Sequence, residues 1–179
     1  MKHTNLNFIC VAGFGYSGSS AIIDLLKEFD QYYVFEKEFR LIKDPDGIID
    51  LENALIRDWQ ELKSDIAIRR FIEFARITGR KQKLFSKIGF NFNEDYNKKF
   101  FHCCEKYIDE LVDIEWNGDW PYHLHDLNWF KLFVYRIKRK LGVSPDLNDR
   151  MYFSSPGNRF YQITRSFLNE LCLNIIDLE

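Results

Sequence analysis

Residues 8–20 read Phe-Ile-Cys-Val-Ala-Gly-Phe-Gly-Tyr-Ser-Gly-Ser-Ser, and this stretch decides the expected fold. The apolar run at 6–12 has the length and composition of a buried β-strand. Three glycines interleaved with serines follow it, and an amphipathic segment at 19–29 begins at once. Glycine lets the backbone turn tightly and approach a ligand closely. The sequence therefore predicts a strand, a glycine-rich turn and a helix in direct succession.

The predicted turn is suited to an anionic ligand. A helix N-terminus presents unpaired N–H groups and the positive end of the helix dipole, and successive turn amides can form an anion-binding nest. The hydroxyls of Ser17, Ser19 and Ser20 add further donors. A plain strand-to-helix turn needs fewer glycines and hydroxyls than this segment carries. We therefore expect a phosphate or sulfate group to bind here.

Two nucleotide-binding motifs can be compared with these residues: one matches in part and the other literally. The ATP/GTP loop, G-x-x-x-x-G-K-[ST], fits Gly13 and Gly18 but has Ser19 in place of the lysine that neutralises the β- and γ-phosphates. The dinucleotide motif, G-x-G-x-x-G, is matched literally by the three glycines, with Glu36 placed to bind a ribose. The Rossmann fold that carries this motif needs a third strand after one more helix, whereas residues 46–114 have mostly helical patterns. A Rossmann oxidoreductase that binds NAD(P) is kept as an alternative.

The segment 14–20 resembles the Pro-Lys-Ser-Gly-Thr-Thr type loop of the P-loop sulfotransferases, which use 3′-phosphoadenosine-5′-phosphosulfate (PAPS). The resemblance implies that loop amides and hydroxyls hold the 5′-phosphosulfate, with no metal. The expected nucleotide-binding residues are Gly13, Gly15, Tyr16, Ser17, Gly18, Ser19 and Ser20. Family members usually carry Lys or Arg where this chain has Tyr16. They also bind the 3′-phosphate through an Arg and a Ser after a later strand, and this sequence has no clear counterpart.

A second similarity to this family follows the predicted strand Tyr32–Phe35. The run Glu36-Lys37-Glu38-Phe39 is similar to the Lys-Glu stretch that supplies the catalytic base in heparan-type members. By this resemblance Glu38, with Glu36 as second choice, deprotonates the acceptor hydroxyl, and Lys37 stabilises charge on the bridging oxygen. The expected reaction is sulfuryl transfer from PAPS to a hydroxyl of a carbohydrate or small metabolite. A catalytically inactive nucleotide-binding or interaction module is a second alternative, because the loop cation and the 3′-phosphate motif are missing.

The rest of the chain predicts mostly helices. Their expected ranges are 19–29, 48–59, 64–79, 94–113, 127–141 and 158–176, with a short strand at 151–153. The resemblance implies an α/β fold of the P-loop NTPase type, with a parallel sheet of few strands and a large helical insertion. Residues 1–179 are expected to form one such domain. The shortage of strands favours either a domain incomplete at its C-terminus or a divergent member.

Composition narrows the function classes. The net charge of −2 gives no overall field that would favour nucleic acid or an anionic membrane. A hydrophobic content of 46% argues against disorder. No apolar run has the length of a membrane span or a secretory signal, so the expected location is cytoplasmic. The four cysteines follow neither a disulfide framework nor a zinc spacing, and we expect free, mostly buried thiols. The oligomeric state is left open.

A basic run without acidic residues lies within the predicted helix at 127–141. Its members are Lys131, Arg136, Lys138, Arg139 and Lys140. Such a run can meet nucleotide phosphate or an acidic glycan, although a solvated helix face is its more common role. The apolar residues at helical spacing in the same segment are expected to point inward. They are Phe130, Phe133, Val134, Ile137 and Leu141.

Overall fold

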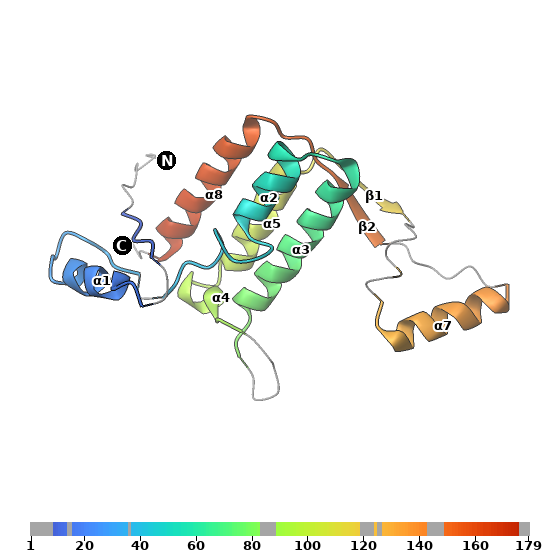
Figure 1. Ribbon diagram of the computed structural model, residues 1–179, viewed down its shortest axis with the longest axis horizontal. Helices are drawn as coiled ribbons and strands as arrows, with labels where there is room; N and C mark the ends of the chain where they lie inside the picture. Colours follow the sequence, from blue (N-terminus) through green and yellow to red (C-terminus); the bar gives the residue numbers. More distant parts are fainter. Residues whose placement is uncertain are drawn as a thin grey trace.

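The fold is dominated by helices, as the computed structural model in Figure 1 shows. The structure describes residues 9–13, 16–35, 37–82, 89–118, 124, 127–142 and 149–175, without the side chain of Asp149. Of these residues 58% are helical, and one sheet of two strands is present among them. A bundle of helices forms the centre, with one helix lying to either side of it (Figure 1).

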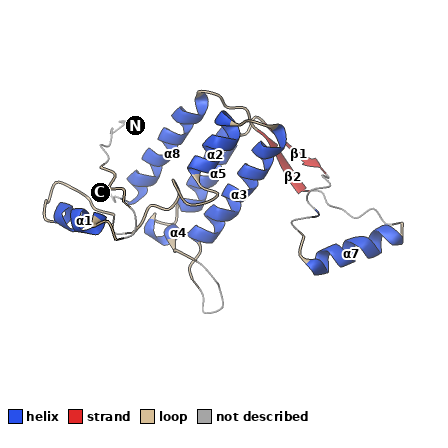
Figure 2. Ribbon diagram, in the orientation of Figure 1, coloured by secondary structure: helices blue, strands red, loops and turns tan. Residues whose placement is uncertain are grey.

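The helices are α1 (Ser19–Lys27), α2 (Ile48–Glu52), the π-helical turn η1 (Asn53–Arg57), α3 (Glu61–Gly79), α4 (Phe92–Asp95), α5 (Phe100–Leu111), α7 (Trp129–Lys140) and α8 (Arg159–Ile175). The strands are β1 (Ile114–Gly118) and β2 (Asp149–Phe153). They pair antiparallel, with Ile114 opposite Phe153 and Trp116 opposite Met151. Figure 2 shows this small sheet at one end of the central bundle.

The hydrophobic core lies where α5 packs between α3 and α8. Each of these helices has apolar residues at three- and four-residue spacing, which places them on one face. Tyr107 of α5 stacks on Phe167 of α8, with ring centroids 4.3 Å apart, and Phe71 of α3 meets Tyr107 edge-on at 5.6 Å. The buried faces of the three helices therefore meet around one aromatic centre.

A second aromatic cluster joins the segment after α1 to the bundle. Phe35 contacts Tyr96 and Phe92, with ring centroids 5.8 and 6.5 Å apart, and Phe100 lies beside both of the latter rings. Leu41, a few residues later, is fully buried. The chain between α1 and α2 is thus anchored on the core, and this anchoring fixes the position of residues 37–40.

Buried hydrogen bonds join β2 and the residue after it to the first turns of α3 and to the end of α5. The Ser154 hydroxyl donates to the carbonyl of Leu111 at 2.7 Å, and the Ser154 N–H donates to the hydroxyl of Ser64 at 3.2 Å. The Tyr152 N–H donates to the carboxylate of Asp65 at 2.9 Å. Buried polar groups cost free energy unless they are paired, so these bonds position the end of β2 against α3.

The hydroxyl of Tyr96 is buried and, among the described residues, has no hydrogen-bond partner. Removing an unsatisfied buried hydroxyl relieves its desolvation cost. Tyr96→Phe is therefore expected to leave the free energy of unfolding unchanged or to raise it by about 1 kcal/mol. Urea unfolding at neutral pH measures this change.

Tyr107→Phe is the matched control, because the hydroxyl of Tyr107 is 2.9 Å from the Thr164 hydroxyl. Its removal leaves a half-buried partner unpaired, and we expect a loss of about 1–2 kcal/mol. If both variants lose the same stability, then the hydroxyl of Tyr96 is hydrogen-bonded and the premise is wrong.

The expected parallel sheet is not confirmed. Residues 9–12 and Tyr32–Phe35 lie outside regular secondary structure, and 6–8 fall outside the described residues. A strand is stabilised by a hydrogen-bonded neighbour, and the described segments supply none for these two stretches. The observed strands pair with each other elsewhere, and only the strand at 151–153 was expected.

Two helix predictions require correction. The helix expected at 94–113 is divided into α4 and α5, because Asn97 and Lys98 have left-handed φ values of 52° and 63°, which an α-helix does not accommodate. The helix expected at 64–79 begins three residues earlier, because α3 starts at Glu61 and Ser64 is buried within its first turns. The other expected helices lie close to their predicted ranges.

The expected inward face of α7 is exposed. Phe130 and Phe133 are 59% and 57% accessible, and no residue of α7 is buried. The prediction from periodicity was therefore wrong about the partner of this face, although it was right about the helix. The remaining apolar positions of that face are also exposed: Val134, Ile137 and Leu141.

Candidate functional site

The glycine-rich loop turns sharply into α1. Gly18 precedes the helix with φ 80° and ψ 10°, a left-handed conformation that glycine adopts without strain. Gly13 lies so close to the helix start that an added Cβ would collide with the Ser17 hydroxyl and come within 2.9 Å of the Ser19 Cβ. The loop therefore folds back on itself. Gly18 needs the left-handed conformation that glycine favours, and a Cβ at position 13 would displace the Ser17 and Ser19 side chains.

The start of α1 is open to an anion. No side chain caps the helix, and its first turn contains no acidic residue. The first amides of a helix have no acceptor within it, and here the Ala21 N–H donates to the carbonyl of Gly18 at 3.0 Å. Ser17 and Ser20 are exposed and Ser19 is half-buried. Amide and hydroxyl donors thus converge near the positive end of the helix dipole.

The predicted loop residues are only partly described. Gly13, Ser17 and Ser19 are brought together, with Gly18 and Ser20 next to them. Tyr16 is fully exposed and has a left-handed φ of 64°. Phe14 and Gly15 lie outside the described residues. The loop lies beside the central bundle rather than within it (Figure 1), since α1 contributes no buried residue.

Lys37 forms an ion pair with a carboxylate that no local sequence pattern predicts. Its ammonium lies 2.7 and 2.6 Å from the two carboxylate oxygens of Asp95, at the end of α4. Both residues are near the aromatic cluster in which Phe35 packs on Tyr96. The positive charge of Lys37 is therefore neutralised, and the side chain points to the bundle.

Glu38 presents an accessible carboxylate. Its side chain is 86% exposed, and one oxygen lies 3.7 Å from the guanidinium of Arg40. Arg40 is fixed in turn by Asp44 at 2.5 Å and by the ring of Phe90, whose centroid is 4.5 Å from the guanidinium carbon. Glu38 is thus free to reach a bound molecule. Glu36, the second-choice base, lies outside the described residues.

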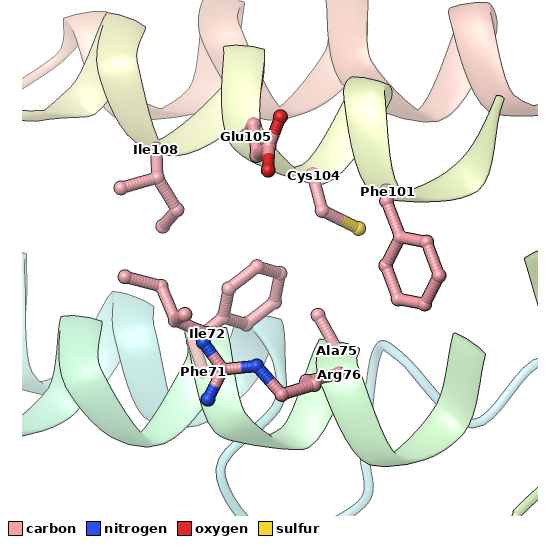
Figure 3. Close-up of a pocket in the computed structure, with 8 residues that line it drawn as sticks. All are labelled: Phe71, Ile72, Ala75, Arg76, Phe101, Cys104, Glu105 and Ile108. Atoms are coloured by element: carbon pink, nitrogen blue, oxygen red, sulfur yellow. The ribbon is translucent and has the colours of Figure 1, made fainter. Parts of the chain in front are cut away.

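A small hollow between α3 and α5 is not a substrate site. Figure 3 shows its mainly apolar lining, with Arg76 and Glu105 coming from the facing helices. Its volume of about 90 Å³ is far below the roughly 300–1,000 Å³ of ligand pockets. Burial raises the pKa of the Cys104 thiol well above its ordinary value, so this group is not a nucleophile at neutral pH.

The cysteines are all free, as predicted, but only Cys103 and Cys104 are buried, while Cys172 is half-buried and Cys10 is exposed. Burial raises the pKa of Cys103 to about 11, which keeps that thiol protonated. Within the described ranges, no group of three His, Cys, Asp or Glu side chains is placed to hold a metal ion. No helix in the described part is both long and apolar enough to cross a membrane.

Comparisons of this chain with models of protein families, with curated proteins and with solved structures find no match. The functional argument therefore depends on the loop at the start of α1 and on the two charged residues anchored beside the bundle. Of the residues that contact them, Asp95 and Arg40 were missed by sequence reasoning. Asp95 lies 58 positions from Lys37, and no local pattern connects the two.

Proposed function

We propose that this chain binds PAPS through residues 13–20 and transfers its sulfuryl group to a hydroxyl of a carbohydrate or small metabolite. The observation that supports this most is the turn in which Gly13 lies against Ser17 and Ser19 at an uncapped helix start. Such a turn offers several donors to the charged 5′-phosphosulfate and no carboxylate to repel it. The similarity of the loop to the sulfotransferase loop favours PAPS over other anions.

The proposed reaction requires one base and no metal. The acceptor oxygen forms a bond to sulfur while the bond between sulfur and the phosphate oxygen breaks, which releases adenosine 3′,5′-bisphosphate. Glu38 accepts the proton of the acceptor hydroxyl, a role that its exposed carboxylate permits. Lys37 stabilises charge on the bridging oxygen, and for this its ammonium must exchange Asp95 for the donor.

The finer fold and the location are part of the same proposal. In it, the domain has the P-loop-type α/β fold that the loop resemblance implies, although residues 9–12 and Tyr32–Phe35 lie outside regular secondary structure. The proposal also treats residues 1–179 as a single sulfotransferase-like domain in the cytoplasm. Both statements stay predictions.

A catalytically inactive nucleotide-binding module is the second candidate. Two observations favour it: Lys37 is already neutralised by Asp95, and an exposed tyrosine, Tyr16, stands where the family carries a cation. Such a module would bind the nucleotide through the same loop and would not transfer the sulfuryl group.

Gly18→Ala tests the loop. Alanine at this left-handed position costs about 1–2 kcal/mol, and we expect the affinity for adenosine 3′,5′-bisphosphate to fall by about 5- to 30-fold as the turn changes shape. Thermal unfolding with the bisphosphate measures this, because a ligand in hundredfold excess over its dissociation constant adds about 2.7 kcal/mol of stability.

Gly142→Ala is the matched control. Gly142 has a similar φ of +71° and, like Gly18, nothing within 4 Å of an added Cβ, but it follows α7. It is expected to bind the bisphosphate as the unaltered chain does. Equal losses in both variants, or no stabilisation of the unaltered chain by the bisphosphate, would contradict the proposal. Stabilisation by NAD alone would favour the Rossmann alternative, and stabilisation by Mg-ATP alone would favour an ATP-binding loop.

A further inference from the structure

Helix α7 presents an apolar face to solvent. Phe130, Phe133, Val134 and Ile137 recur at the spacing i, i+3, i+4, i+7 and share an arc of about 100°. All four are exposed, and Leu141, one helical turn beyond Ile137, is 72% accessible. Leu132 and Tyr135, on the opposite side, are half-buried, so the apolar face points outward.

The same helix is strongly basic. It carries five cations, and residues 127–142 include no acidic residue, although the whole chain has a net charge of −2. At 100° per residue, Lys131 and Lys138 border one edge of the apolar arc, and Arg136 and Lys140 border the other. All of these side chains are exposed. Cations therefore flank the apolar face on both sides. Trp129, the first residue of α7, is 79% accessible.

We propose that α7 lies flat on a membrane surface rich in anionic lipids. A helix with Trp, Phe and Ile on one face and Lys and Arg around it inserts that face at the boundary between headgroups and acyl chains. The long basic side chains bury their methylene groups there and place their charges at the lipid phosphates. In this position the apolar residues leave water, and the four cations that border the apolar arc meet anions.

Charge and apolarity together select this partner. Nucleic acid would neutralise the cations but would leave the row of Phe and Ile side chains in water. A second copy of α7 would cover the apolar face but would bring two sets of cations together. Of these three partners, the anionic lipid surface is the one that satisfies both faces at once. Because α7 lies apart from the bundle (Figure 1), its apolar and basic face is accessible to a membrane. The inference is independent of the proposed sulfotransferase activity.

Flotation of the full chain with vesicles tests the proposal. We expect binding to vesicles of phosphatidylglycerol and phosphatidylcholine, weak binding to phosphatidylcholine alone, and a decrease as salt is raised. Phe133→Ser with Ile137→Ser is expected to lower partitioning by about tenfold or more. Lys138→Glu with Lys140→Glu is expected to do the same through the loss of lipid attraction.

Matched controls come from the helical bundle. Ile66→Ser removes an aliphatic side chain that is 44% exposed on α3, and Lys98→Glu with Lys99→Glu makes the same charge change at two exposed positions before α5. Both are expected to float like the unaltered chain. Because α7 has no buried residue, its variants should keep the same thermal unfolding temperature, which shows that lost flotation is not lost folding.

Two outcomes would overturn the proposal. The first is no flotation of the unaltered chain, and the second is flotation that the α7 variants do not reduce. If the unaltered chain does not float and the α7 variants lose self-association in size-exclusion chromatography, the face belongs to a second copy; if they lose binding to a DNA duplex, it belongs to nucleic acid.

Discussion

Glu38→Gln is expected to lower sulfuryl transfer by about 10²- to 10⁴-fold, which is the usual contribution of a general base. The amide that replaces the carboxylate keeps the shape of the side chain but cannot accept the hydroxyl proton at neutral pH. Affinity for adenosine 3′,5′-bisphosphate is expected to stay unchanged, because Glu38 is 86% exposed and contacts Arg40 at 3.7 Å, outside the loop. Turnover is measured as bisphosphate released from PAPS with a panel of hydroxyl acceptors.

Glu28→Gln is the control for this experiment. Glu28 is an exposed carboxylate immediately after α1, at the opposite end of that helix from the loop, so its removal makes the same charge change without touching the proposed base. Equal turnover in Glu38→Gln and the unaltered chain would remove Glu38 from the mechanism. Bisphosphate binding without turnover by the unaltered chain, for every acceptor, is instead the result expected of the inactive module.

Sequence periodicity predicted the helices because their apolar faces are regular. The spacing of Phe160, Ile163, Phe167 and Leu171 indicates α8, and the same four residues are buried in the core. Periodicity does not say what covers a face, since exposed and buried amphipathic helices have the same pattern. For that reason the prediction succeeded for α8 and was wrong for the outward face of α7.

The strands were harder to predict. The run Tyr32–Phe35 has the β-branched and aromatic content of a strand, but pairing depends on a neighbour that local composition cannot reveal. Its Phe35 instead packs on Tyr96. Conversely, β1 includes Asn117 and Gly118, which are poor strand formers, and β1 exists because it pairs with β2. Tertiary contacts overrode local preference in both cases.

The sequence predicted the glycine-rich turn of the candidate site but not the contacts between distant residues. Glycines and hydroxyls within eight residues of each other indicate a turn at a helix start. Gly18 has a left-handed φ that favours glycine, and Gly13 has little room for a Cβ beside Ser17 and Ser19. The Lys37–Asp95 pair depends on how the segment after α1 packs against α4, and its partners are 58 residues apart. The sequence therefore could not show that the charge of Lys37 is already neutralised by Asp95.

Phe71→Ala is expected to cost about 3–5 kcal/mol of unfolding free energy, the range for truncating a buried phenylalanine. Phe71 is fully buried, and its ring meets that of Tyr107 at 5.6 Å where α3, α5 and α8 converge. It also lines the hollow of about 90 Å³ between α3 and α5 (Figure 3), so truncation enlarges an existing space. Because residual cavity volume adds to the cost, we expect a value near the upper end.

Urea unfolding measures this loss, and Ile66→Ala is the matched control. Ile66 is on the same helix and is 44% exposed, so its truncation leaves no closed cavity and should change the free energy by less than about 1 kcal/mol. Against a total stability of about 5–15 kcal/mol for a natural domain, the loss at Phe71 is large enough to populate the unfolded state. If the two variants were equally stable, α3 would not bury Phe71 against α5, and the packing around Tyr107 described above would be wrong.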